Sequence, residues 1–387
     1  MTSEETGLAP AGLQPARTIE CGVELTRLRD AWRAASTVSG DGTFTLAISR
    51  DSIRLLAQGE VAVEATVPIA NTTGITVGEE FHLNLSSDSL AALGHGDLDE
   101  SGKLLFGEVQ LEEGFVGILR LQTSFTVTWP YTLTKVGSVT IDDHEGLVLQ
   151  SVDPRTVRQT LAEIRNFAGD NDRAGNNLNT LQIWDQEALG MSPSACQSVK
   201  SDRLTSVCLR VPAFCAKVLG VLLTQLKSSE TQLGVSGEKC VLLDGRLKII
   251  APMAPPLPSW PDNGPATAQF QLDVTDFTAA VAAIVWQAPR DNPIITFGVG
   301  MDARALTLST AVPGGMAMAS CPIASANRVQ PAEVSLRFGA STLSSFSTRN
   351  NDAVQFRVFE RFVEIEQVSP GERRRTLLAV ERARSYS

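Results

Sequence analysis

Apolar residues recur at helical spacing near the start of the chain, between residues 23 and 36. This spacing is typical of a helix that buries one face, so we predict an amphipathic helix. Its apolar face carries Leu25, Leu28, Trp32 and Ala35. The opposite face carries Arg27, Asp30 and Ala34, with Arg33 near its edge.

The same spacing predicts three further helices. Asp153 followed by Pro154 combines a capping residue with a first-turn proline, so a helix begins there. Its apolar stripe consists of Val157, Leu161, Ile164 and Ala168. The other predicted helices span residues 212–226 and 273–286, with two short ones at 86–93 and 341–347.

Short apolar and alternating runs between these helices predict antiparallel strands. Hairpins are predicted at 43–49 with 52–58, 103–111 with 115–122, 232–236 with 240–243, 294–299 with 305–310, and 354–359 with 362–368. Further strands are predicted at 179–185, 195–199, 204–209, 247–251, 334–338 and 375–380.

The order of helices and strands repeats three times along the chain. The units begin near residues 18, 146 and 268, which predicts three α+β domains of one architecture, each with two helices and antiparallel sheets. We place the domains at 18–142, 143–262 and 263–387, after a flexible tail at 1–17. Residues 252–265 contain six prolines and are interpreted as a linker or surface loop between the second and third units.

The composition is that of a folded protein with an acidic balance. Hydrophobic residues make up 43% of the 387, which excludes overall disorder. The formal net charge of -10 counts against a protein that wraps nucleic acid by charge alone. Six cysteines occur without CxxC spacing, as expected for reduced thiols in the cytoplasm. We find no signal peptide, and the most apolar helices are too short to span a membrane.

The chemistry expected of a catalytic site is sparse. The three histidines, His82, His95 and His144, do not lie at metal-ligand spacing from one another or from a cysteine. Neither a phosphate-binding GxxxxGK[ST] loop nor a GxGxxG turn occurs. These absences count against an enzyme, and we expect neither a metal nor a cofactor.

Motifs in the middle unit carry a family resemblance. Residues 177–181 (NLNTL) resemble a "YLNG(V/M)" strand, with Asn177 replacing the aromatic residue and Thr180 the glycine. Residues 195–207 (ACQSVKSDRLTSV) resemble a "TDGHRLA" segment, in which Arg203 and Leu204 match. Residues 211–226 resemble a "VP.K...EL..LL" helix and keep Lys217. Residues 376–383 (TLLAVERA) occupy the place of a "Y-(V/L)-(V/I)-(M/L)-P-(M/V)-R" strand. Of that motif only Arg382 is kept, and Val380 stands in place of its proline.

Together these segments resemble the bacterial sliding clamps, the beta subunits of DNA polymerase III, over residues 18–383. The first unit matches by element order alone. The resemblance implies a head-to-tail homodimeric ring that encircles duplex DNA without reading its sequence. It also implies that the ring tethers a replicative DNA polymerase, is opened by a clamp loader, and has no catalytic activity.

The resemblance also implies two sets of site residues. Those expected to face DNA phosphates are Arg27, Arg33, Arg155, Arg158, Gln159, Asn166 and Lys217. Those expected to line a pocket for the short linear motifs of clients are Leu178, Val199, Arg203, Leu204, Leu377, Ala379 and Val380. Solvent-exposed helix charge and ordinary strand packing are the alternative interpretations of these sets.

Other functions remain open at this stage. The same fold could serve a regulatory or decoy protein that competes with a host clamp. A β-rich structural protein of an assembly, or an enzyme with an unrecognised site, would belong to different classes. The negative charge excludes none of these, since a ring held on DNA by topology needs only a few inward-facing cations.

Overall fold

The computed structural model describes residues 17–40, 42–88, 90, 101–111, 114–122, 126–132, 146–169, 178–227, 229–290, 293–300, 302, 304–328, 332–339, 342–343, 346 and 353–381, with backbone alone for those between 101 and 132. The chain forms two compact units. Unit 1 comprises Met1–Pro154, Lys217–Gly234 and Val241–Ala251, and unit 2 comprises Arg155–Ala216, Val235–Cys240 and Pro252–Ser387. Residues 1–16 of the tail predicted at 1–17 lie outside the described residues, and its last residue, Arg17, instead begins β1.

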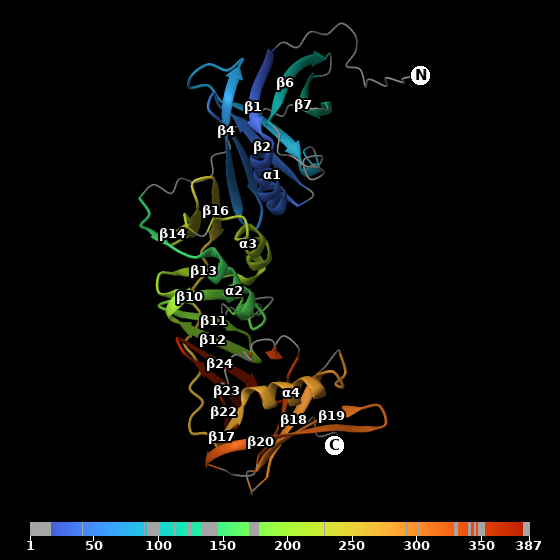
Figure 1. Cartoon of the computed structure of the whole chain (residues 1–387), viewed down its shortest axis with the longest axis vertical. Helices are drawn as coiled ribbons and strands as arrows, with labels where there is room; N and C mark the ends of the chain where they lie inside the picture. The colour runs from blue at the N-terminus through green and yellow to red at the C-terminus, as the bar shows by residue number, and fades with distance from the viewer. Residues whose placement is uncertain are drawn as a thin grey trace. The chain divides into compact units, whose positions relative to one another are not determined.

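Unit 1 is built on a 12-stranded sheet with the path β8-β7-β6-β1-β4-β16-β15-β14-β9, and β3, β2 and β5 branch from β4 (Figure 1). The strands are β1 (Arg17–Glu24), β2 (Thr43–Ile48), β3 (Ser52–Gln58), β4 (Ala62–Thr73), β5 (Phe81–Ser86), β6 (Ser101–Leu111), β7 (Gly114–Gln122), β8 (Thr126–Thr132), β9 (Leu149–Ser151), β14 (Gln232–Val235), β15 (Lys239–Leu243) and β16 (Leu247–Pro252). Its helices are α1 (Leu25–Ser39) and α3 (Ala216–Leu222).

Helix α1 packs on β3 and β4 through its apolar face. Leu25 and Leu28 are fully buried there, as the sequence pattern predicts. Ala34 is also buried, so its assignment to the polar face was wrong: a small side chain fits where the helix approaches the sheet closely. Trp32 is half-buried, and its indole Nε1 donates to the carbonyl of Ser87 at 2.9 Å.

Unit 2 is built on a second 12-stranded sheet, ordered β13-β10-β11-β12-β24-β23-β22-β17-β20-β19-β18-β21. Its strands are β10 (Thr180–Trp184), β11 (Glu187–Met191), β12 (Ala195–Ser201), β13 (Leu209–Pro212), β17 (Ala268–Asp273), β18 (Ile294–Val299), β19 (Ala305–Val312), β20 (Gly315–Arg328), β21 (Ala332–Arg337), β22 (Ala353–Val358), β23 (Phe362–Ser369) and β24 (Glu372–Ala379). Its helices are α2 (Pro154–Arg165) and α4 (Val274–Val285), with single 3-10 turns at Asp202–Leu204 and Ala213–Cys215.

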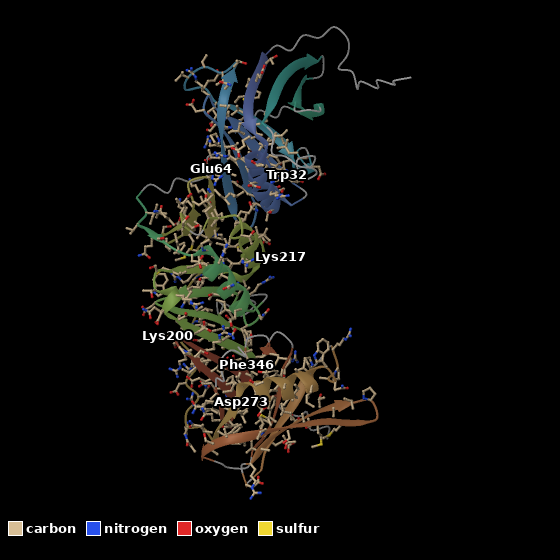
Figure 2. All side chains as sticks on the ribbon, viewed as in Figure 1. Trp32, Glu64, Lys200, Lys217, Asp273 and Phe346 are labelled. Carbon is tan, nitrogen blue, oxygen red and sulfur yellow. The ribbon has the colours of Figure 1, made fainter. Side chains whose placement is uncertain are left out.

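Helix α4 closes the largest core of unit 2. The carboxylate of Asp273 caps the helix by accepting the backbone N–H groups of Thr275 and Asp276, at 2.8 and 3.1 Å (Figure 2). Phe277 is fully buried and meets Phe346 edge to face, with ring centroids 5.6 Å apart. This cap and this aromatic contact fix the helix on the sheet.

Three predicted elements differ from the structure. The strand expected at 204–209 is wrong, because Asp202–Leu204 forms a 3-10 turn and β13 begins only at Leu209. The helix expected at 212–226 is a 3-10 turn followed by α3, which ends at Leu222. Ala168 lies beyond the end of α2, and Phe167 is buried instead. The short helices expected at 86–93 and 341–347 lie largely outside the described residues.

The described strands include several meanders of three consecutive strands, and three of these differ in the position of their last strand. They are β6-β7-β8, β14-β15-β16 and β22-β23-β24. The last strand of the second meander pairs with β4, with Leu247 opposite Ala65. The last strand of the third pairs with β12, with Cys196 opposite Leu377. Strand β8, the last of the first, ends its sheet. The three domain boundaries remain a prediction.

Candidate functional site

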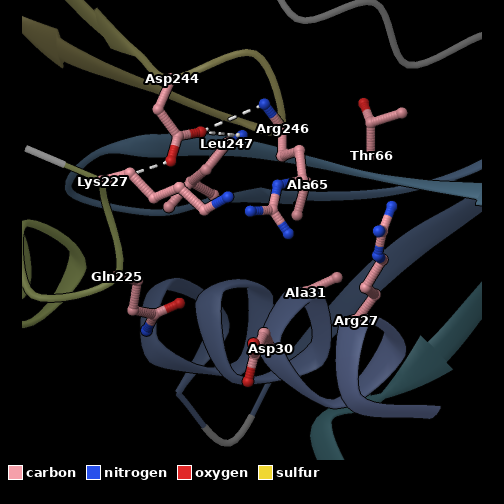
Figure 3. A pocket seen from close by; sticks show the side chains of 10 residues that line it. All are labelled: Arg27, Asp30, Ala31, Ala65, Thr66, Gln225, Lys227, Asp244, Arg246 and Leu247. Atoms are coloured by element: carbon pink, nitrogen blue, oxygen red, sulfur yellow. Dashed lines mark hydrogen bonds between the residues drawn. The ribbon is translucent and has the colours of Figure 1, made fainter. Parts of the chain in front are cut away.

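A cationic hollow lies within unit 1, between α1, β4 and the turn that joins β15 to β16. Its volume is about 140 Å³. Arg27, Lys227 and Arg246 reach it from three different segments, and Figure 3 shows the ends of the Lys227 and Arg246 side chains directed into it. The sequence analysis named only Arg27 of these three.

The hollow is shaped by Asp244, whose side chain is only 5% exposed. Its carboxylate accepts the backbone N–H groups of Lys227, Arg246 and Leu247, at 3.1, 3.1 and 2.9 Å. Gly245 completes the turn at φ +84°, a conformation that favours glycine. Because these hydrogen bonds already satisfy the carboxylate, it serves the backbone of the turn and fixes where Arg246 begins.

The charges around the hollow leave room for an anion. Arg27 of α1 pairs with Glu24 at the end of β1, at 2.6 Å. Among the described residues, neither Lys227 nor Arg246 has a carboxylate partner within 4.0 Å. Asp30 also lines the hollow and weakens its positive field. Arginine and lysine donors grouped in this way can hold a phosphate group through charge-assisted hydrogen bonds.

The residues predicted to face DNA are on helix surfaces of both units. In unit 1, Arg33 is exposed on α1. Lys217, labelled in Figure 2, is exposed on α3. In unit 2, the exposed face of α2 and its C-terminal turn carry Arg155, Arg158, Gln159 and Asn166. These four lie opposite the buried stripe of Val157, Leu161 and Ile164. Their contact with DNA remains a prediction.

The residues predicted to line the client pocket do not form one surface. Leu377 and Leu178 belong to one apolar cluster. Val199 lies opposite Arg374 in the β12–β24 ladder, and residues three apart in a strand face opposite sides, so Val199 lies on the other face from Leu377. Val380 packs with the core under α4. Leu204 is buried and Arg203 is exposed in the 3-10 turn after β12, whereas Ala379 is half-buried on β24.

The proline-rich segment supplies two members of the cluster around Leu377. Leu189, Met191, Cys196, Leu257 and Leu377 are its buried residues, and Leu178, Trp260 and Phe362 pack against it. The sequence analysis interpreted residues 252–265 as a linker or surface loop. The structure confirms a surface segment, because residues 253–267 form no helix or strand and more than half of residues 252–265 are exposed. Leu257 nevertheless packs inward at 8% exposure, and its N–H donates to Gln182 Oε1 at 3.2 Å, so we call residues 253–267 the strap.

Buried ion pairs join strands β22, β23 and β24 beside this apolar cluster. Glu364 and Glu366 are 2% and 3% exposed on β23. Arg357 pairs with both, and Arg375 reaches Glu364 at 2.8 Å. The guanidinium of Arg375 also lies over the ring of Trp260, 4.5 Å from its centroid, so this arginine joins the ion pairs to the strap.

The described residues contain no group of three or more histidine, cysteine, aspartate or glutamate side chains placed to hold a metal ion. Within the same residues, no helix has both the length and the apolar character needed to cross a membrane.

Comparison with solved structures identifies the fold. No protein-family model matches the sequence, and no curated protein matches it. A DNA polymerase sliding clamp from Bacillus subtilis matches with a TM-score of 0.73 at 9% identity, over 94% of this chain and 99% of that one. The beta sliding clamp of C. crescentus gives 0.73 at 13% identity, over 95% and 100%. The DNA polymerase III beta subunit of Thermotoga maritima gives 0.72 at 12%, over 94% and 100%.

These matches confirm the expected fold class. The chain has the α+β fold of bacterial DNA polymerase III beta sliding clamps, with antiparallel sheets and few helices. The likeness extends over nearly the whole of each chain, although the sequences have diverged widely.

The geometry of the cationic hollow depends on Asp244, and this can be tested directly. In Asp244→Ala, the N–H groups of Arg246 and Leu247 lose their acceptor, so hydrogen exchange in the 244–252 peptide should accelerate by at least about tenfold. Exchange in α4 is the internal reference. Unchanged protection of the 244–252 peptide would show that the carboxylate does not organise the turn.

Proposed function

We propose that this protein is a DNA sliding clamp, a non-catalytic processivity factor that encircles duplex DNA and tethers a replicative DNA polymerase. The observation that carries the proposal is the match to solved clamps over 94% of this chain and 99% of the matched chain. The same proposal includes other clients besides the polymerase, a clamp loader and a location in the cytoplasm. Whole-length likeness favours this function over that of a structural assembly protein, which would need no such correspondence.

Closure of the ring is supported by the strand pairings inside the chain. Two meanders end on strands that pair with a strand of another repeat: β16 with β4, and β24 with β12. In the described chain, β8 ends its sheet and residues 315–322 of β20 pair on one side only, with β19. The third equivalent pairing is therefore β8 of one subunit with β20 of another. Because these edges differ, the contact is head-to-tail, and two copies would close into a ring of six domains.

DNA is held in this proposal by topology and weak phosphate contacts. The exposed side chains of α1, α2 and α3 would give screened, sequence-independent contacts. Lys227 and Arg246 of the cationic hollow join them. A net charge of -10 is compatible with this arrangement, because a topologically held ring does not need tight neutralisation of the backbone.

A clamp-like decoy is the second candidate, and one observation favours it. Leu377 and Leu178, expected to receive a client motif, are packed against Leu257 and Trp260 of the same chain. A ring whose client site is always filled would occupy DNA without recruiting a polymerase. Stimulation of a polymerase by the loaded protein would exclude the decoy, whereas inhibition of a resident clamp would support it.

Retention on circular DNA tests the proposed topology. Protein loaded on a nicked circular duplex should stay bound through gel filtration at high salt, and cutting the circle once should release it, since a ring slides off a free end. A circle blocked by a bound protein on both sides of the cut is the matched control and should retain the ring. Protein that remains on unblocked linear DNA would contradict encirclement.

The phosphate role of the hollow predicts a change in salt dependence. Each phosphate contact adds about 0.9 to the slope of log affinity against log salt concentration. The double variant Lys227→Ala, Arg246→Ala removes two cations and should lower the magnitude of this slope by about 1 to 2 for a short linear duplex measured by fluorescence anisotropy. Lys200→Ala, which removes an exposed cation from β12, is the control. An equal slope in wild type and double variant would remove the hollow from the DNA interface.

The proposed strand pairing between subunits can be broken at one backbone atom. Ile323 donates its N–H to Arg304 of the β19 side, and donors alternate along a strand, so the N–H of Met318 points to the free edge of β20. Met318→Pro removes that donor and preserves the β19 ladder, whereas Met318→Ala keeps it.

Light scattering distinguishes these variants. The wild type and Met318→Ala should have twice the 41.4 kDa mass of the chain, and Met318→Pro should shift towards the monomer by at least about tenfold in dissociation constant. A Met318→Pro dimer of unchanged affinity would place the subunit interface elsewhere.

A further inference from the structure

The strap over the cluster around Leu377 is hydrogen-bonded at both ends and has few hydrogen bonds to the rest of the chain in its middle. Between β16 and β17, residues 253–267 form no helix or strand. At its start, the N–H groups of Met253 and Ala254 donate to the carbonyls of Glu238 and Arg210, and at its end Thr267 N–H donates to the carbonyl of Val358. In the middle, Thr180 Oγ1 donates to the carbonyl of Pro255 at 3.3 Å and Leu257 N–H donates to Gln182, while Leu257 and Trp260 insert apolar side chains into the cluster.

The buried position of Trp260 leaves a polar atom without a hydrogen bond. Its indole Nε1 is buried without a hydrogen-bond partner, and so is Oδ1 of Asn263 three residues later. A buried donor without an acceptor opposes burial, because it loses its hydrogen bond to water. The aromatic face is nevertheless favourable, with Arg375 stacked over it. The ring of Trp260 is therefore attracted to Arg375, while burial of its Nε1–H costs free energy. The two effects oppose each other, so the net stability of this contact is reduced.

We propose that the strap is an internal occupant of a peptide groove, formed by β10–β12 and β24, that Leu257 and Trp260 fill in cis. Release of the strap opens the groove to a linear peptide with an aliphatic anchor and an aromatic anchor three residues later, the spacing of Leu257 and Trp260 themselves. The groove takes such a peptide as an extended segment whose backbone N–H meets Gln182. This inference rests on the proposed function in treating the groove as a client site.

The covalent tether sets the strength that a client needs. A segment joined at both ends competes at a high effective concentration, on the order of millimolar for a short flexible connection. To displace the strap, a partner must bind the groove more tightly than the same strap sequence would as a free peptide. The required factor is the ratio of the strap's effective concentration to the partner's concentration, and it falls when the partner is held on the same DNA. This makes recruitment conditional on the partner being close by.

Cys196 reports on the strap without any client. It lies in the cluster at 5% exposure, and burial raises the pKa of its thiol to about 11, so it should be alkylated slowly in the native protein. Cys21 on β1 of unit 1 and Cys321 on β20 are fully buried away from the strap and serve as internal references. The double variant Leu257→Ser, Trp260→Ala should raise the alkylation rate of Cys196 by at least about tenfold and leave the references unchanged. Pro258→Ala, exposed in the same segment, is the matched control.

A peptide supplied in trans tests the occupant itself. A fluorescent peptide of residues 252–265 should bind the double variant and protect Cys196 again, whereas wild type, already filled, should not bind it. The same peptide with serine at both anchor positions is the negative control.

Three results would overturn the proposal. The first is an unchanged alkylation rate at Cys196 in the double variant. The second is equal acceleration at all three thiols, which would make the strap an inseparable part of the fold. The third is failure of the wild-type peptide to bind the double variant. Since neither assay contains DNA, these failures are distinct from failure of the circular-DNA test.

Discussion

Backbone pairing between the edges of separate repeats is the constraint on which the rest of this structure depends. A sheet edge that lacks a partner exposes unpaired N–H and C=O groups, and pairing it satisfies them. The chain satisfies two such edges internally, through β16 on β4 and β24 on β12. Each pairing merges strands of different repeats into a 12-stranded sheet. In the proposed ring, β8 and residues 315–322 of β20 are the edges that would meet in a second subunit.

This constraint also decides where charge and polar chemistry can lie. The turn after β15 is held beside β4, since Thr66 N–H donates to the carbonyl of Arg246 at 2.7 Å. That contact brings Arg246 towards Arg27 of α1 although the two are far apart in sequence. Likewise, the β12–β24 ladder brings Cys196 beside Leu377 and creates the surface that the strap covers. Both candidate sites are thus consequences of strand pairing between repeats.

The sequence predicts the elements whose signal is local. Capping and periodicity locate α4 from Asp273 onward, and the repeated order of helices and strands indicates the fold class. The sequence misses β20, because its run of small, sulfur-containing and polar residues lacks alternation. The sequence pattern also places Ala34 on the polar face of α1, whereas Ala34 is buried. Whether a small residue such as alanine is buried depends on how closely the helix approaches the sheet, which the sequence pattern does not contain. The roles of Arg246, Leu257 and Trp260 depend on pairings between distant segments, which no local pattern contains.

In the proposed function, two copies of the chain close head-to-tail into a ring. Electron cryomicroscopy of the isolated protein at micromolar concentration tests it most directly. We expect closed particles of two chains around a central hole, with β8 of one subunit beside residues 315–322 of the other. Particles that are single chains, or dimers joined by matching surfaces with no enclosed hole, would contradict it.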